Sequence, residues 1–201
     1  MHPVPAFLET DRDTLLERIA AWPFALVIGA TGARPHAAHT PVIFREDGQL
    51  GFHLARSNPA CRAIAAPGRA LIVFSGPHDY ISPDWYGQAD QVPTWNYLSV
   101  EAEGPVSVLD NDATATLLDE LAAQFERGLA PKPEWTRAKM DDGKFRRMLG
   151  AITGFNLSPE RLEGITKTGQ NKPDEVRQRA GAALKAAGGD PTISEIMERT
   201  S

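Results

Sequence analysis

Short apolar runs separated by turn-forming residues dominate the chain, and runs of about four to eight residues bounded by such turns are typical of β-strands. Turn chemistry at Thr31–Ala33 and Glu46–Gly48 predicts an antiparallel meander, and we expect Pro105–Leu109 to close a hairpin with the long run before it. The runs predicted as strands are Phe24–Ala30, His36–Phe44, Gln49–Leu54, Ala70–Ser75, Thr94–Glu103, Pro105–Leu109, Ile152–Leu157 and Arg161–Thr166.

Other segments repeat their apolar residues at helical spacing. The clearest is Thr10–Ala21, with a capping residue at Thr10 or Asp11 and an apolar face around Leu15 and Ile19. The remaining helical segments are Pro59–Ala66, Ala113–Glu126, Glu134–Ala151 with a break near Asp142–Gly143, and the tail from Pro173 onward.

This order of elements predicts a mainly β fold with peripheral helices. A small closed barrel is the most economical way for about six or seven strands to avoid exposed edges. We expect one barrel domain over residues 1–172, with an N-terminal helix and inserted helices, followed by a helical tail over residues 173–201. No repeat of fixed period is visible, which argues against solenoids and propellers.

Composition adds constraints of its own. With 201 residues, 42% of them hydrophobic and 23% charged, the chain has the composition of a folded globular domain. Its single cysteine, Cys61, cannot form an internal disulfide. The apolar stretches are far shorter than the roughly 20 residues of a membrane span, and Glu9, Asp11 and Asp13 precede any apolar run, unlike a signal peptide. We therefore expect a cytoplasmic protein without membrane contact.

The segment Gln49–Ile64 runs from a strand through a polar turn into the start of a helix. Such a junction presents free backbone N–H groups, and Arg56, Ser57, Asn58 and Arg62 add donors that suit a phosphate. The alternative is an ordinary helix start in which Asn58, just before Pro59, is the N-cap.

The segment Ser75–Tyr97 holds two of the four Trp and all three Tyr residues. Aromatic side chains with one polar edge suit a flat ligand such as a flavin or a contact between two copies of the chain. The alternative is a proline-locked loop whose aromatic residues cap the barrel.

The stretch Leu162–Lys172 places cations and amides around a glycine turn after a strand. Lys167, Gln170 and Asn171 could together bind a phosphate or the carbonyl groups of a flavin ring, although a solvated turn is the usual explanation for such residues. We predict no metal site, because His36 and His39 lie three residues apart in a strand and should face opposite sides.

Taken in order, several phrases resemble the PaiB-type FMN-binding negative transcriptional regulators, a branch of the split-barrel flavin proteins related to pyridoxamine phosphate oxidases. The chain departs from the family at Ala38–Pro41, where the family pattern reads more like Asn-His-Leu-Pro, and in a shorter tail. The phrases that carry the resemblance are Met1–Phe7, His53–Pro59, Phe74–Tyr86, Val92–Tyr97, Gly154–Phe155, and Lys167 with Gln170 and Asn171.

The resemblance implies a homodimer of six-stranded split β-barrels with FMN at the subunit interface. One small barrel is filled by its own side chains, so a second subunit is needed to enclose the flavin. By resemblance, the phosphate lies at Arg56, Ser57 and Asn58. The strand residues under the ring are His39, His53 and Leu54, and those that close the site, some from the partner chain, are Thr94, Trp95, Asn96, Lys167, Gln170 and Asn171.

Three functions remain open at this stage. A regulator would let bound flavin bias its contact with DNA or a partner protein, although the net charge of −5 does not favour DNA. An FMN-dependent oxidoreductase would act on a small molecule, but no substrate acid or base is evident. A haem-binding or haem-degrading protein would need one of the histidines as an axial ligand. Direct DNA contact would rest on Lys167, Lys172, Arg177, Arg179 and Lys185.

Overall fold

The computed structural model describes residues 2–66 and 68–199, and the chain divides into two compact units. The larger unit comprises Ile19–Phe74 and Glu101–Leu162, and the smaller unit comprises Met1–Arg18, Ser75–Val100 and Glu163–Ser201. No helix among the described residues is both long enough and apolar enough to cross a membrane.

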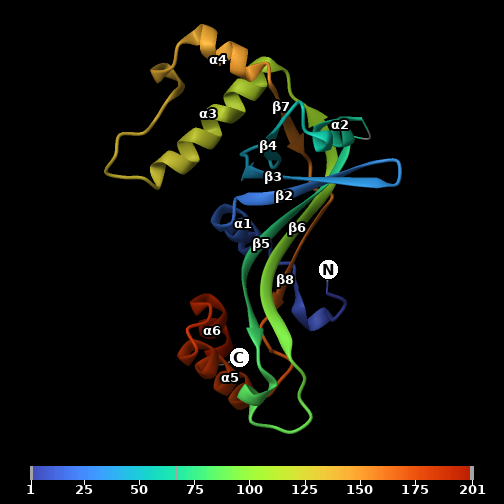
Figure 1. Ribbon diagram of the computed structural model, residues 1–201, viewed down its shortest axis with the longest axis vertical. Coiled ribbons are helices and arrows are strands. Elements are labelled where there is room, and N and C mark those ends of the chain that lie inside the picture. Colours follow the sequence, from blue (N-terminus) through green and yellow to red (C-terminus); the bar gives the residue numbers. More distant parts are fainter. Residues whose placement is uncertain (1, 67, 200–201) are drawn as a thin grey trace. The chain divides into compact units, whose positions relative to one another are not determined.

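Antiparallel strands form the framework (Figure 1). The sheet has eight strands in the order β1-β8-β6-β5-β2-β3-β4-β7, and a further pairing of β6 with β7 joins six of them in a ring. The mainly β fold class is thereby confirmed. Strand β8 matches the expected strand at Arg161–Thr166, whereas the two-residue β1 was not expected. The strands are β1 (Leu8–Glu9), β2 (Phe24–Thr31), β3 (Arg34–Phe44), β4 (Leu50–Ala55), β5 (Arg69–Ile81), β6 (Thr94–Val108), β7 (Ile152–Leu157) and β8 (Arg161–Lys167).

Alternating side chains fill the inside of the ring. Phe52 of β4 and Phe155 of β7 are fully buried and stack with ring centroids 5.3 Å apart. Val27 of β2 and Ile72 of β5 are also fully buried. Since residues at every second position of a strand share a face, the intervening residues of β4 and β7 point outward.

The expected hairpin between Thr94–Glu103 and Pro105–Leu109 is wrong, because β6 runs unbroken from Thr94 to Val108. Gly104 explains the continuity. A Cβ at this position would lie 1.9 Å from the main-chain oxygen of Ser158. Only glycine therefore lets these two segments of the backbone approach this closely. Pro105 lacks an N–H donor, but its carbonyl accepts a hydrogen bond from the Ser158 N–H at 3.0 Å.

Polar side chains cap the helices of the larger unit, and the cap at Asn58 is the one that we expected. Asn58, Asp110 and Asp141 each accept a main-chain N–H with their side chains at the starts of α2 (Pro59–Ala65), α3 (Asn111–Arg127) and α4 (Asp142–Leu149). The expected helix over Glu134–Ala151 is therefore too long. It begins at Asp142, where we expected a break, and only the short 3-10 turn η3 (Arg137–Lys139) precedes it.

Helix α3 lies against the outer face of β7, and Gly154 permits the close approach. A Cβ at Gly154 would lie 2.6 Å from Thr114 Oγ1 and 3.1 Å from Thr114 Cβ. Beside α3 runs α4, as Figure 1 shows. His53 pairs with Gly154 in the sheet, so its side chain lies on the same face of the sheet, which α3 covers.

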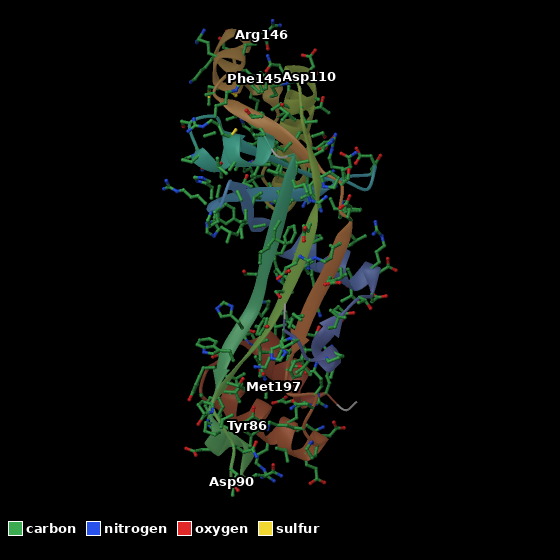
Figure 2. All side chains as sticks on the ribbon, turned by 90° about the vertical axis from the view of Figure 1, so that its right-hand side faces the viewer. Tyr86, Asp90, Asp110, Phe145, Arg146 and Met197 are labelled. Carbon is green, nitrogen blue, oxygen red and sulfur yellow. The ribbon has the colours of Figure 1, made fainter. Side chains whose placement is uncertain are left out.

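In the smaller unit, helices α5 (Asp174–Ala186) and α6 (Pro191–Glu198) pack side by side. Buried Arg177 joins them by donating to the carbonyl oxygens of Ile196 at 3.1 Å and Arg199 at 2.6 Å. Figure 2 labels Tyr86 and Met197 beside this helix pair. The unit also holds η1 (Pro5–Phe7), η2 (Pro83–Tyr86) and most of α1 (Arg12–Ala21). The boundary between residues 172 and 173 stays a prediction.

We expect Gly154→Ala to lower the free energy of unfolding by about 1–3 kcal/mol, because the new methyl group overlaps the root of the Thr114 side chain. Urea unfolding measures the loss. Gly128→Ala is the control, since Gly128 has φ −71° and a Cβ there would lie 3.6 Å from its nearest neighbour. Adding Thr114→Ala should make Gly154→Ala nearly harmless, and an equal loss in both backgrounds would contradict the close-approach argument.

Candidate functional site

The turn between β4 and α2 is held firmly in place. The main-chain N–H of Arg56 donates to the Ala151 carbonyl at 2.9 Å, and its Nε donates to the Ile152 carbonyl at 2.8 Å. Asn58 Oδ1 accepts the Ala60 N–H at 2.9 Å, so Asn58 is the N-cap as expected. The rest of the exposed Arg56 guanidinium and the exposed Ser57 hydroxyl remain available to an anion.

His53 lies on the outer face of β4, three residues before Arg56. Burial lowers the pKa of its imidazole below the ordinary value, so the neutral form is favoured. Its Nδ1 is buried and has no hydrogen-bond partner within residues 2–66 and 68–199. The neighbouring Leu54 side chain is buried inside the ring, so a ligand outside the ring can meet only the main chain of Leu54.

His39 lies on β3 and is exposed. Its ring stacks on that of Phe24, with centroids 5.7 Å apart and planes 20° apart. Phe24 is itself 67% exposed, so the pair forms a flat aromatic surface on the outside of the larger unit. Such a surface suits contact with another flat or apolar group.

A second set of predicted residues gathers in the smaller unit, around a cavity of about 330 Å³. Four of the six residues expected to close the flavin site line this cavity, which we call the lysine pocket. They are joined by Lys172, Tyr86 and the N-terminal residues His2, Val4 and Phe7. The four are Thr94, Asn96, Lys167 and Asn171.

Two ammonium groups and the carboxylate of Asp90 give the lysine pocket its charge. Lys167 Nζ donates to Thr94 Oγ1 at 2.5 Å and to the Trp95 carbonyl at 2.8 Å, and burial lowers its pKa. Lys172 Nζ donates to Gln91 Oε1 at 2.5 Å and lies 4.2 Å from the centroid of the Tyr86 ring. Sequence reasoning did not select Lys172 and Tyr86 as site residues, because only the fold brings them together.

Gln170 and Asn171 differ sharply although they are neighbours. Gln170 Oε1 accepts the Thr168 N–H at 2.9 Å, and its Nε2 donates to the carbonyl oxygens of Ala6 and Thr166. Gln170 therefore ties the end of β8 to the N-terminal segment, whereas Asn171 is exposed at the lysine pocket. A structural role for Gln170 is evident, and its role in cofactor binding stays a prediction.

Trp95 and Asn96 face different surroundings. Asn96 is buried and its Nδ2 contacts Met197 Sδ at 3.2 Å, so it secures α6. Trp95 is 54% exposed and its ring centroid lies 6.1 Å from those of His78 and Tyr80. The predicted residues thus form one set in each unit, and none of the described residues form a cluster of three metal-binding side chains.

A ring of antiparallel strands with helices on its outside is also the fold of solved flavin-binding proteins. Over residues 1–161 the chain matches the family described as "Putative FMN-binding domain", and it belongs to that family. This match confirms FMN as the cofactor.

Individual relatives agree with this assignment. The chain is 31% identical over 152 residues to "Protease synthase and sporulation protein PAI 2" of Bacillus subtilis (strain 168), covering 74% of this chain and 72% of the relative. It is also 30% identical over 115 residues to "Uncharacterized protein YKL070W" of Saccharomyces cerevisiae, covering 52% of this chain and 68% of the relative. The resemblance to PaiB-type proteins is thereby confirmed.

Solved structures support the fold. The flavocytochrome Anf3 from Azotobacter vinelandii superposes with a TM-score of 0.63 at 17% identity, covering 84% of this chain and 73% of that one. The FAD and heme binding protein from Mycobacterium smegmatis gives a TM-score of 0.61 at 22% identity, covering 91% and 80%. At these identities the likeness concerns the fold alone.

We expect the free energy of unfolding to decrease as the pH falls, because His53 is buried. Because burial lowers the pKa of His53, the unfolded chain takes up a proton more readily than the folded chain below about pH 6.5. The stability is therefore fully present above that pH and is lost as the pH falls through the lowered pKa. We expect the decrease in unfolding free energy between pH 7.5 and pH 5 to be smaller in His53→Gln, as measured by urea unfolding. Equal decreases would contradict the assignment.

The Gln170 and Asn171 side chains offer a matched pair for mutation. Gln170→Ala removes bonds to Ala6, Thr166 and Thr168, so we expect the FMN-free protein to lose about 1–3 kcal/mol of unfolding free energy. Asn171→Ala, at an exposed position, should change it by less than about 0.5 kcal/mol. Thermal and urea unfolding of both variants test this, and similar values for the two would refute the structural role of Gln170.

Proposed function

We propose that the chain functions as an FMN-binding homodimer, with the flavin at the contact between two copies, and that it acts as a negative regulator. The lysine pocket carries this proposal, because it collects Thr94, Asn96, Lys167 and Asn171 around one cavity in a chain of the FMN-binding family. The regulatory role rests on the resemblance to PaiB-type proteins.

The β4–α2 turn fits a phosphate group. FMN, when bound, supplies a ring that accepts and returns electrons, whereas the protein binds and orients it. Arg56 is suited to hold the phosphate because its Nε is anchored to Ile152, which orients the remaining N–H groups of the guanidinium. The Ser57 hydroxyl is a further donor, and Asn58 keeps the turn in shape as the helix cap.

Lys167 fits an acceptor atom of the flavin. An ammonium group carries three N–H donors, and the bonds to Thr94 and Trp95 use two of them. The third N–H can donate into the lysine pocket. Because the other two bonds fix the position of the ammonium group, the Lys167 side chain loses little conformational entropy when a ligand binds.

A second copy of the chain fits the exposed aromatic surfaces. At about 330 Å³ the lysine pocket is near the lower end of the range of about 300–1,000 Å³ for ligand sites. A second subunit would supply the missing walls. The exposed side chains of Phe24, Tyr80, Val92 and Trp95 suit such a contact, since aromatic residues are enriched where proteins associate.

Each of the five basic residues that could contact DNA has a partner within the protein, and only two of them, Arg179 and Lys185, are exposed. Arg177 is 4% exposed and bonded within the helix pair, and Lys167 and Lys172 donate to protein oxygen atoms. Arg179 donates to the Tyr86 carbonyl at 3.0 Å. Together with the net charge of −5, this supports regulation through a partner protein rather than through direct DNA contact.

We expect Arg56→Ala to weaken FMN binding at least tenfold, because each charge-assisted hydrogen bond to a phosphate contributes about 1.5–3 kcal/mol. Quenching of FMN fluorescence on titration with protein measures the affinity. Arg34→Ala, at an exposed position in the β2–β3 hairpin, removes the same charge and should leave the affinity unchanged.

Further measurements test the rest of the proposal. Sedimentation of the FMN-loaded protein should give a dimer at micromolar concentration, and a stable monomer would contradict the shared site. If Arg56→Ala retained FMN as well as the wild-type protein, the turn would only cap α2 and would not bind the phosphate. A Soret band in place of a flavin spectrum would assign haem, and turnover of a small molecule by bound FMN would assign an oxidoreductase.

A further inference from the structure

The wall of the lysine pocket carries more positive than negative charge. Within the described part of the chain, neither the Lys167 nor the Lys172 ammonium group forms an ion pair with a carboxylate. Asp90 is the one acidic residue in the wall, and it is exposed to solvent. His2 Nδ1 accepts the Val4 N–H at 3.3 Å, so this imidazole adds no charge. Two cations and one anion leave a single positive charge for a ligand to balance.

Lys172 is the donor of this pocket that the proposed flavin contacts leave unused. Its Nζ donates to Gln91 Oε1 at 2.5 Å, which occupies one of its three N–H groups. The ammonium group also lies 4.2 Å from the centroid of the Tyr86 ring, and this cation–π contact holds it in place. Figure 2 labels Tyr86 and Asp90, which both belong to the connection between β5 and β6. Two N–H groups of Lys172 therefore remain for an acceptor, and the exposed Asn171 amide is a further donor.

Apolar side chains form much of the remaining wall. Val4 and Phe7 come from the N-terminal segment, and Tyr86 and Val92 come from the connection between β5 and β6. An inorganic anion would leave these side chains uncovered, whereas a molecule with an apolar body buries them. At about 330 Å³ the pocket is near the lower end of the range for ligand sites, which suits a molecule of about one ring. The wall therefore favours an organic anion with a single charge.

We propose that the lysine pocket binds a small aromatic carboxylate through Lys172, and that this carboxylate competes with the flavin ring for the pocket. The competition rests on the proposed function, which places an acceptor atom of the flavin at Lys167 in the same pocket. A pocket of this volume does not hold the flavin ring and a second aromatic molecule together. The carboxylate therefore lowers the affinity for FMN, and FMN lowers the affinity for the carboxylate. FMN occupancy of the proposed homodimer then depends on the carboxylate concentration.

Competition in the full-length protein tests this proposal. The apparent FMN dissociation constant is measured by fluorescence quenching at increasing benzoate, with sodium chloride keeping the ionic strength constant. We expect this constant to rise linearly with the benzoate concentration. Benzamide, which lacks the charge, and acetate, which lacks the ring, should change it by less than about twofold. An FMN constant that benzoate leaves unchanged, or that benzamide or acetate raises equally, would overturn the proposal.

A variant of Lys172 tests the location. Lys172→Met keeps a side chain of similar length and removes the charge, so we expect the benzoate inhibition constant to rise at least about tenfold, the value of one charge-assisted hydrogen bond. Lys185→Met is the control, because Lys185 lies on α5, is 66% exposed and does not line the pocket. Circular dichroism checks folding, and Lys172→Gln takes the place of Lys172→Met if that variant does not fold. Equal inhibition constants in the Lys172 and Lys185 variants would overturn the proposal.

Calorimetry separates a failure of this inference from a failure of the proposed function. Titration of the FMN-free protein with benzoate measures carboxylate binding directly. If FMN binds and benzoate neither binds nor competes, the inference is overturned and the proposed function stands. If benzoate binds through Lys172 and FMN does not bind, the proposed function is refuted and the carboxylate site stands. Equal benzoate affinity in the FMN-free and FMN-loaded protein would overturn the competition.

Discussion

The pairing of β6 with β7 closes the strand ring, and this closure decides where ligands can bind. Val106 lies opposite Leu157 in that pairing, and the enclosed interior is filled by side chains such as Phe52 and Phe155. A filled interior of close-packed side chains has no room for a ring system. Every candidate binding residue of the larger unit therefore acts from the outer face of the ring or from a turn at its end.

The outer face is consequently where glycine and histidine matter most. Gly154 lets α3 approach β7, and His53, its partner on β4, lies under the helix that this approach positions. The same strand continues into the Arg56 turn, which the carbonyl groups of Ala151 and Ile152 hold. One pair of strands thus positions both the turn that suits a phosphate and the face on which α3 docks.

Local signals in the sequence predicted much of this arrangement. The cap at Asn58 depends only on a few adjacent residues, and α2 begins at Pro59 as expected. Long-range contacts were harder to predict. The residues Gly104 and Pro105 predict a turn, yet β6 is continuous there because the main chain of Ser158 approaches Gly104. No residue near position 104 in the sequence indicates that contact.

The candidate site shows the same division. Lys167, Gln170 and Asn171 form one polar phrase in the sequence, but their surroundings separate them. Gln170 bonds to Ala6, which lies 164 residues earlier, and Asn171 remains exposed. Likewise, the position of Lys172 over Tyr86 depends on the fold of the smaller unit, so residue type alone could not reveal it.

The buried guanidinium of Arg177 has a consequence for the integrity of the chain. Two of its acceptors are main-chain oxygen atoms of Ile196 and Arg199, which belong to the final turn of α6 and the residue after it. Loss of these positions would remove two acceptors from a buried cation, which would keep the carboxylate of Asp174 at 2.8 Å. Cleavage within α6 would therefore lower the stability of the helix pair, and cleaved copies would become substrates for cellular quality control.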